Sequence, residues 1–202
     1  MLSDVKIGRM ISTNKMKTIC IFCGTDIGER TVYAQDARRL ACTMLGKDIN
    51  LIYGGGKTGL MRVIADEYIK RGKVPTAIIP KEYAEEKLSS NVKIIVSTSK
   101  NERLKTMMQL SDGFIALPGS IGTVREIITV LYYIYMGVIC KPCAIFNSAL
   151  YYNPLVEFLD NCVKEGFLSQ EHRKILLVKD NPEDLIEAFE NYEAVISPKQ
   201  WK

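Results

Sequence analysis

Histidine is nearly absent from this sequence, which contains only one among its 202 residues. That residue, His172, lies in the polar run SQEHRK, which indicates a surface position near a short helix. We therefore do not expect a histidine to act as a catalytic base here.

Long hydrophobic runs are also missing. The longest apolar stretch spans residues 127–140, which is shorter than the ~20 residues that a membrane helix needs. Residues 1–16 lack the apolar run of a signal peptide, and we expect them to form a flexible polar tail. We therefore expect a cytoplasmic protein with no membrane segment and with reduced cysteines.

The basic residues do not form blocks. The net charge is +4 and the sequence pI is about 8.6, and the lysines and arginines are scattered along the chain. This balance does not call for a nucleic-acid partner, and it indicates only a mild preference for small anions.

The six cysteines include two CxxC pairs, Cys20 with Cys23 and Cys140 with Cys143, a spacing that often indicates zinc. The first pair lies within a predicted strand, where side chains three positions apart point to opposite faces. The second pair flanks a proline that enters another predicted strand. We therefore predict buried thiols and no metal site.

Short apolar runs alternate with amphipathic segments along the chain. The runs predict β-strands covered on both faces at residues 18–23, 49–53, 75–80, 92–97, 113–118, 143–147 and 175–178. Apolar residues at helical spacing predict helices at residues 30–48, 58–72, 101–111, 123–137, 151–166 and 182–192.

This alternation predicts an α/β fold, with a doubly wound parallel sheet and helices on both of its faces. Ligands bind such sheets beyond the carboxyl ends of the strands. Because we find no linker, repeat or low-complexity run, we predict a single domain over residues 17–202.

The segment YGGGKTGLM joins a predicted strand to a predicted helix, and its Gly54, Gly56 and Gly59 match the pattern GxGxxG. A standard NAD site also needs an acidic residue at the end of the next strand, where Pro80 and Lys81 stand instead. Dinucleotide binding stays an alternative. The loop otherwise indicates backbone that approaches an anion closely at a helix start.

A second glycine loop, LPGSIGT, follows another predicted strand. Gly119 and Gly122 frame the turn, and we expect Thr123 to begin the next helix. The amides of this loop, with the hydroxyls of Ser120 and Thr123, form a nest suited to a phosphate. No carboxylate cluster accompanies the loop, so no divalent metal is needed.

Glu126 has two interpretations. Residues 123–126, TVRE, fit a capping box, in which the glutamate accepts a hydrogen bond from the Thr123 amide. Alternatively, the carboxylate lies one turn from the phosphate nest, stays ionised near the helix amino end and acts in catalysis. Both interpretations remain open from the residues alone.

Arg103 also has two interpretations. It lies in the first turn of a helix that Ser99 and Glu102 are predicted to cap, where a cation is unfavourable by ~0.3–1 kcal/mol. The arginine is either a solvated side chain or, because local rules are broken most often at functional sites, part of the site at the same sheet edge.

The ordered set of motifs resembles the LONELY GUY (LOG) family, whose members are often mislabelled lysine decarboxylases. The family reads FCGSS, YGGGxxGLM, an MxxRK-like stretch and PGGxGTxxE. This sequence reads FCGTD at residues 22–26, YGGGKTGLM at 53–61, NERLK at 101–105 and PGSIGTVRE at 118–126. The resemblance extends from about Lys17 to Phe189.

This resemblance implies a Rossmann-like homodimer that hydrolyses the N-glycosidic bond of purine nucleoside 5′-monophosphates and needs no cofactor. The usual substrates of the family are cytokinin riboside monophosphates and AMP, and the products are the free base and ribose 5-phosphate. By resemblance, Arg103 and Glu126 are the catalytic residues. The substrate-binding residues are Gly55, Gly56, Gly119, Ser120, Gly122 and Thr123.

Two positions depart from the family pattern. Ser120 replaces the second glycine of PGG, where it would crowd a backbone of positive φ or add a hydroxyl for the phosphate. Leu104 replaces the lysine of RK, and Lys105 follows one position later, ~100° around the helix. We expect activity or substrate choice to differ as a result.

Other functions are weighed against this one. A pyridoxal-phosphate enzyme needs a Schiff-base lysine, and the only candidate is Lys57, which lies in a turn. A module that binds a nucleotide without hydrolysing it would need the glycine loops but not Arg103 and Glu126. The stripe of Tyr132, Tyr133 and Tyr135 on an almost wholly apolar helix predicts core packing and a dimer contact.

Overall fold

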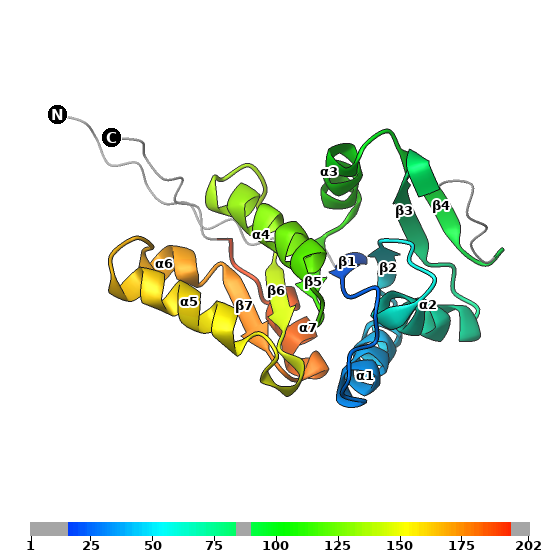
Figure 1. The fold of residues 1–202 in the computed structure, drawn as a ribbon, viewed down its shortest axis with the longest axis horizontal. Helices are drawn as coiled ribbons and strands as arrows, with labels where there is room; N and C mark the ends of the chain where they lie inside the picture. Colours follow the sequence, from blue (N-terminus) through cyan, green and yellow to red (C-terminus); the bar gives the residue numbers. More distant parts are fainter. Residues whose placement is uncertain (1–15, 84–89, 195–202) are drawn as a thin grey trace.

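The chain folds around one parallel β-sheet (Figure 1). The computed structural model describes residues 16–83 and 90–194. The strands are β1 (Thr18–Phe22), β2 (Asn50–Tyr53), β3 (Thr76–Pro80), β4 (Lys93–Ser97), β5 (Gly113–Ala116), β6 (Cys143–Phe146) and β7 (Leu176–Lys179). Their order in the sheet is β4-β3-β2-β1-β5-β6-β7, and every neighbouring pair is parallel. All of the predicted strands are confirmed, with ends that differ by one or two residues.

Helices cover both faces of the sheet, as predicted. Helices α1 (Val32–Gly46), α2 (Gly59–Lys70) and α7 (Pro182–Glu190) pack on one face. Helices α3 (Lys100–Leu110), α4 (Ile121–Tyr135) and α5 (Asn153–Lys164) pack on the other. In Figure 1, α1 and α2 lie on the side of the strands opposite α3 and α4. The short helix expected near His172 is α6 (Gln170–Arg173).

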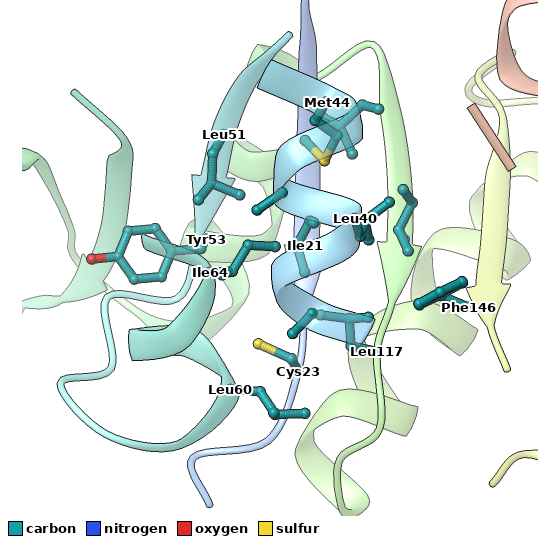
Figure 2. Packing of buried hydrophobic residues seen from close by; sticks show 14 of the residues in the cluster. Ile21, Cys23, Leu40, Met44, Leu51, Tyr53, Leu60, Ile64, Leu117 and Phe146 are labelled. Atoms are coloured by element: carbon teal, nitrogen blue, oxygen red, sulfur yellow. The ribbon is translucent and has the colours of Figure 1, made fainter. Parts of the chain in front are cut away.

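The core under α1 explains why its apolar residues recur at helical spacing. Leu40 and Met44 are fully buried and belong to the same cluster as Ile21 of β1. In Figure 2, Ile21 lies beside Ile64 of α2, and Leu40 and Met44 extend from α1 into the same cluster. Each fully buried leucine or isoleucine contributes roughly 1.5–3 kcal/mol of transfer free energy, so this helix is held mainly by its packed face.

Strand β4 departs from the prediction that every strand is covered on both faces. It forms one edge of the sheet, and Ile94 and Val96 are 41% and 51% exposed. Ile95, which points to the opposite face, packs against the cluster that contains α3. No helix among residues 16–83 and 90–194 covers the outer face of β4. The apolar residues on that face, Ile94 and Val96, are therefore exposed although the sequence predicts that they are buried.

The ends of the predicted domain are only partly described. The predicted tail, residues 1–16, lies outside the described residues except for Met16, which packs against the core. All strands in the described part of the chain belong to the same sheet. Within that part, no helix combines the length and the apolar character needed to cross a membrane.

Candidate functional site

The two glycine-rich loops lie at the same edge of the sheet, as predicted. The strand order reverses between β1 and β5, which is the point where sheets of this type bind ligands. The Gly24 amide, after β1, donates a hydrogen bond of 3.0 Å to the Pro118 carbonyl, after β5. The loop after β2 joins them through the Thr58 hydroxyl, which donates to the Thr25 carbonyl at 2.8 Å.

Two adjoining chambers open at this edge. The first, which we call the β1 chamber, has a volume of about 200 Å³ and is lined by the end of β1 and by Ser120, Gly122 and Thr123. The second, the β3 chamber, has a volume of about 600 Å³ and is lined by Gly55, Gly56 and the end of β3. The residues common to both linings are Thr25, Gly54, Met61, Arg103, Gly122 and Glu126.

Arg103 and Glu126 form an ion pair where the chambers meet. The Arg103 Nη1 atom lies 2.5 Å from the Glu126 Oε1 atom, and each side chain is 15% exposed. The Arg103 Nε atom also donates to the Ile78 carbonyl at 2.7 Å. A charge-assisted hydrogen bond in a partly dry site is stronger than a neutral one in water. The pair therefore offsets the unfavourable position of Arg103 in the first turn of α3.

The capping-box interpretation of Glu126 is wrong. Helix α4 begins at Ile121, with Ser120 at its N-cap, and so Thr123 does not begin the helix as predicted. Glu126 consequently lies in the second turn, and its carboxylate bonds to Arg103. The capping box predicted for α3 is largely confirmed, because the Ser99 hydroxyl accepts from the Glu102 amide at 3.1 Å. The Glu102 carboxylate reaches one residue further back than predicted, to the Thr98 amide at 2.6 Å.

The start of α4 is suited to an anion. Amides in the first turn of a helix have no intrahelical acceptor, and the Ser120 side chain makes no capping hydrogen bond that would occupy one. Ser120, Gly122 and Thr123 line the β1 chamber, so the start of α4 lies at its wall. The positive end of the helix dipole adds to the attraction for an anion there.

Gly119 and Ser120 lie at the same edge, where both line a further pocket of about 170 Å³, and Ser120 also lines the β1 chamber. Gly119 lines neither chamber, and a Cβ at this position would lie 2.2 Å from the Thr123 hydroxyl oxygen and 2.8 Å from the Gly24 amide. Gly119 thus allows the close packing of the loops. Ser120 has φ −97°, an ordinary extended conformation, so the expected crowding at positive φ does not occur.

The second departure from the family pattern falls in the core. Leu104 is 3% exposed and packs with Met107 and Met108 on the inner face of α3. Lys105 is exposed and lines neither chamber. No lysine ammonium therefore stands beside Arg103 at the place where the family pattern has one.

Glycines after β2 shape the wall of the β3 chamber. Gly55 has φ +77°, which favours glycine over any side chain. Gly54 is needed for a different reason, which sequence reasoning missed. A Cβ on Gly54 would lie 2.5 Å from the Arg103 Nη2 atom and 2.9 Å from the Met61 sulfur. The guanidinium therefore rests against the Gly54 backbone.

The cysteines of the first CxxC pair lie on opposite sides of the sheet, as predicted. Cys20 belongs to the cluster on the α3 and α4 side, and Cys23 to the cluster on the α1 and α2 side. Cys23 lines the β1 chamber, where burial, with a smaller contribution from the Glu126 carboxylate, raises the pKa of its thiol well above the ordinary value. This thiol stays protonated and is a poor nucleophile and metal ligand. In residues 16–83 and 90–194, no three His, Cys, Asp or Glu residues are grouped to hold a metal ion.

Two cations in the β3 chamber were not predicted. Lys100, the first residue of α3, and Arg125, which precedes Glu126, both line this chamber. The Arg125 Nη2 atom donates to the Asn101 side-chain oxygen at 2.9 Å. The only signal in the sequence was the presence of these residues inside the two site motifs. Lys57, by contrast, is exposed and lines neither chamber.

Comparisons with known proteins agree with this architecture. A family model described as "possible lysine decarboxylase" matches residues 61–189. The cytokinin riboside 5′-monophosphate phosphoribohydrolase LOG1 of Arabidopsis thaliana is 34% identical over 198 residues, which cover 94% of this chain and 92% of that protein. LOG2 of the same plant, named for the same activity, is 33% identical over 181 residues, covering 89% of this chain and 85% of that protein.

Solved structures share the fold at lower identity. A molybdenum cofactor carrier protein from Chlamydomonas reinhardtii has a TM-score of 0.64 and 17% identity, with 86% of this chain and 94% of that chain covered. A molybdenum cofactor binding protein from Rippkaea orientalis has a TM-score of 0.63 and 18% identity, with 85% and 94% covered. These neighbours establish the Rossmann-like fold alone. Identity above 30% across almost the full length of LOG1 shows that the chain belongs to the LONELY GUY (LOG) family.

Proposed function

We propose that this protein hydrolyses the N-glycosidic bond of purine nucleoside 5′-monophosphates and releases the free base and ribose 5-phosphate. The observation that carries the proposal is the Arg103–Glu126 pair, which lies where the two chambers meet. Its carboxylate is one turn from the amides at the start of α4. The names of the relatives, which are phosphoribohydrolases of cytokinin riboside 5′-monophosphates, support the same reaction.

The mechanism follows from where charge develops. As the bond between C1′ of the ribose and the base nitrogen breaks, positive charge builds on the ribose ring. The Glu126 carboxylate stabilises that charge and orients the attacking water, whose oxygen bonds to C1′. One proton of the water goes to the departing base and the hydroxyl stays on the ribose. No cofactor takes part in these steps.

Substrate placement follows from the two chambers. The 5′-phosphate binds the start of α4 in the β1 chamber, through the amides and the Ser120 and Thr123 hydroxyls. The base occupies the β3 chamber, whose Met61 and Ile79 offer apolar surface. Arg103 holds Glu126 in place and contacts the hydroxyls or the phosphate of the nucleotide. Fixing both ends of the nucleotide places C1′ beside Glu126.

The direct test is to incubate the pure protein with AMP and with isopentenyladenosine monophosphate and to separate the products by chromatography. Release of free base supports the proposal and ranks the two substrates. Nucleotides that bind but stay intact would contradict it and would favour a binding module. An absorbance spectrum free of a pyridoxal band is expected, because the one tempting Schiff-base lysine, Lys57, is exposed and lines neither chamber.

Gly54→Ala is expected to lower kcat by about tenfold or more while changing the melting temperature little. The new methyl group would displace the Arg103 guanidinium, which is the mobile end of a long side chain, and so would disturb the pair without opening the core. Gly46→Ala is the matched control, because a Cβ there meets no atom within 4 Å. Unchanged turnover in Gly54→Ala would show that the position of Arg103 does not depend on this glycine.

We also propose that the protein is a homodimer that buries the apolar surface of α4, α5 and the segment that follows α5. This surface includes Tyr132 (54% exposed), Phe158 (61%) and Phe167 (82%), around a groove of about 430 Å³. Tyr133 and Tyr135 are partly buried against the core, as predicted for part of the tyrosine stripe, and Tyr135 also lines the groove. A groove that is apolar on this scale is typical of a surface that another protein covers.

Phe158→Asp is expected to shift the protein from dimer to monomer in light scattering coupled to gel filtration, because a carboxylate cannot be buried unpaired in an apolar contact. Val74→Asp is the control, since Val74 is also 61% exposed but lies outside this surface. A wild-type protein that is monomeric at micromolar concentration would overturn the dimer proposal. The proposed location remains the cytoplasm, which fractionation of the source cells tests.

A further inference from the structure

We propose that the β3 chamber binds a second anionic group of the substrate, a carboxylate carried on the amino group of the purine base. The inference rests on the proposed function, because it assumes that a purine nucleoside monophosphate occupies the site. It would give this protein a preference for base substituents that are acidic over those that are apolar.

The two chambers differ in charge. The described side chains that line the β1 chamber include one cation and one anion, Arg103 and Glu126, and these neutralise each other. The lining of the β3 chamber contains the same pair together with Lys100 and Arg125. Within the described part of the chain, this lining therefore carries a charge of +2, with Glu126 as its only carboxylate.

Arg125 is oriented without being neutralised. One guanidinium nitrogen donates to the Asn101 side-chain oxygen at 2.9 Å, which fixes the side chain against the start of α3. Asn101 has no charge, so the positive charge of Arg125 is retained. A guanidinium has five N–H donors in a fork that matches a carboxylate, and this contact uses only one nitrogen.

Lys100 and Arg125 face the same space from different helices. Lys100 begins α3, where the helix dipole disfavours a cation, and Arg125 adds a like charge across the chamber. Repulsion between like charges is relieved when an anion binds between them. Both side chains are exposed, so solvent screens their repulsion, and an anion bound between them is attracted by both charges.

The second anion is placed on the side of the base by the position of the phosphate loop. Ser120 and Thr123 line the β1 chamber and not the β3 chamber, so the 5′-phosphate is bound away from Lys100 and Arg125. The lining of the β3 chamber also includes Met61, Ile79 and Pro80, whose apolar surface is suited to a flat base. A carboxylate that reaches Lys100 and Arg125 must therefore be attached to the edge of the base that faces away from the ribose.

The test measures ligand affinity in the Glu126→Gln variant by calorimetry, so that substrate is not consumed. The ligands are AMP, N6-(1,2-dicarboxyethyl)-AMP and ADP, whose second anion lies on the base and on the phosphate chain, respectively. We expect the dicarboxylate to bind about 10- to 100-fold tighter than AMP, as one or two charge-assisted hydrogen bonds allow. ADP should gain less than threefold.

Variants made in the same background identify the residues responsible. Arg125→Gln should remove most of the advantage of the dicarboxylate, and Arg125→Lys should restore only part of it because the fork is lost. Lys100→Gln should reduce the advantage by a few-fold. Lys105→Gln, which removes the same charge from the exposed side of α3 outside both chambers, should leave it unchanged.

Three results would overturn the inference. Equal affinity for AMP and the dicarboxylate would show that the chamber has no such preference. An equal loss of AMP and dicarboxylate binding in Arg125→Gln would assign Arg125 to the 5′-phosphate. A gain for ADP in place of the dicarboxylate would put the second anion on the phosphate chain. Failure of the proposed function is seen separately, as intact AMP after incubation with the wild-type protein.

Discussion

Glu126→Gln is expected to lower kcat for hydrolysis of a purine nucleoside monophosphate by about 10²–10³-fold, with a small change in substrate affinity. The amide keeps the shape of the side chain and can still accept a hydrogen bond from Arg103, so the fold is preserved. It cannot stabilise positive charge on the ribose or polarise the attacking water. The measurement is single-turnover release of free base.

Glu190→Gln is the matched control for this prediction. Glu190 is also in an ion pair, with Lys47 at 2.7 Å, but both side chains are more than 40% exposed and lie outside the two chambers. Surface pairs contribute about 0–1 kcal/mol to stability, so this variant should be nearly normal in turnover and in melting temperature. Near-normal turnover by Glu126→Gln as well would remove the carboxylate from the mechanism.

Arg103→Lys is expected to lower kcat by about 10²-fold, although the positive charge is kept. The guanidinium bonds Ile78 through Nε and Glu126 through Nη1 at the same time. A lysine has one nitrogen and cannot make both contacts in this geometry. Arg103→Gln should be at least as impaired, and should lose about 1–3 kcal/mol of stability because the Glu126 carboxylate and the Ile78 carbonyl lose a buried donor.

The double variant tests whether the two side chains act as one unit. If Arg103 works by holding Glu126, then Arg103→Gln combined with Glu126→Gln should be little worse in kcat than the more impaired single variant. Rate losses that multiply would mean that Arg103 contacts the substrate independently of the carboxylate. The comparison requires single-turnover rates for all four proteins.

Most of the fold could be predicted because the physical signal is local. The runs at residues 113–116 and 143–146 are apolar at every position or nearly so, and all of their residues are buried in the centre of the sheet. The outer face of β4 could not be predicted from the same kind of run. Ile94 and Val96 look like core residues, and their exposure depends on whether a distant helix covers the sheet edge.

The sequence predicts which segments form the site better than it predicts the contacts between their residues. The glycine loops could be placed at one edge of the sheet because parallel strands bring their carboxyl ends together. The sequence predicts that α4 begins at Thr123, whereas it begins at Ile121. Both Ser120 and Thr123 are residue types that favour an N-cap, and the choice between them depends on how Thr123 packs under Gly119. The contact of Gly54 with Arg103 joins residues far apart in the chain, and no local pattern indicates it.

The contacts of Arg103 bear on how the protein acquires activity as it folds. This side chain on α3 is held by the carbonyl of Ile78 on β3, by the backbone of Gly54 after β2 and by Glu126 on α4. These contacting residues come from before and after Arg103 in the chain, and from both sides of the place between β1 and β5 where the strand order reverses. A chain that has formed only one half of its sheet has the residues of the site without their geometry. After dilution from denaturant, catalytic activity should therefore return late in refolding. Its recovery should coincide with the docking of α3 and α4, whereas helix content should recover earlier.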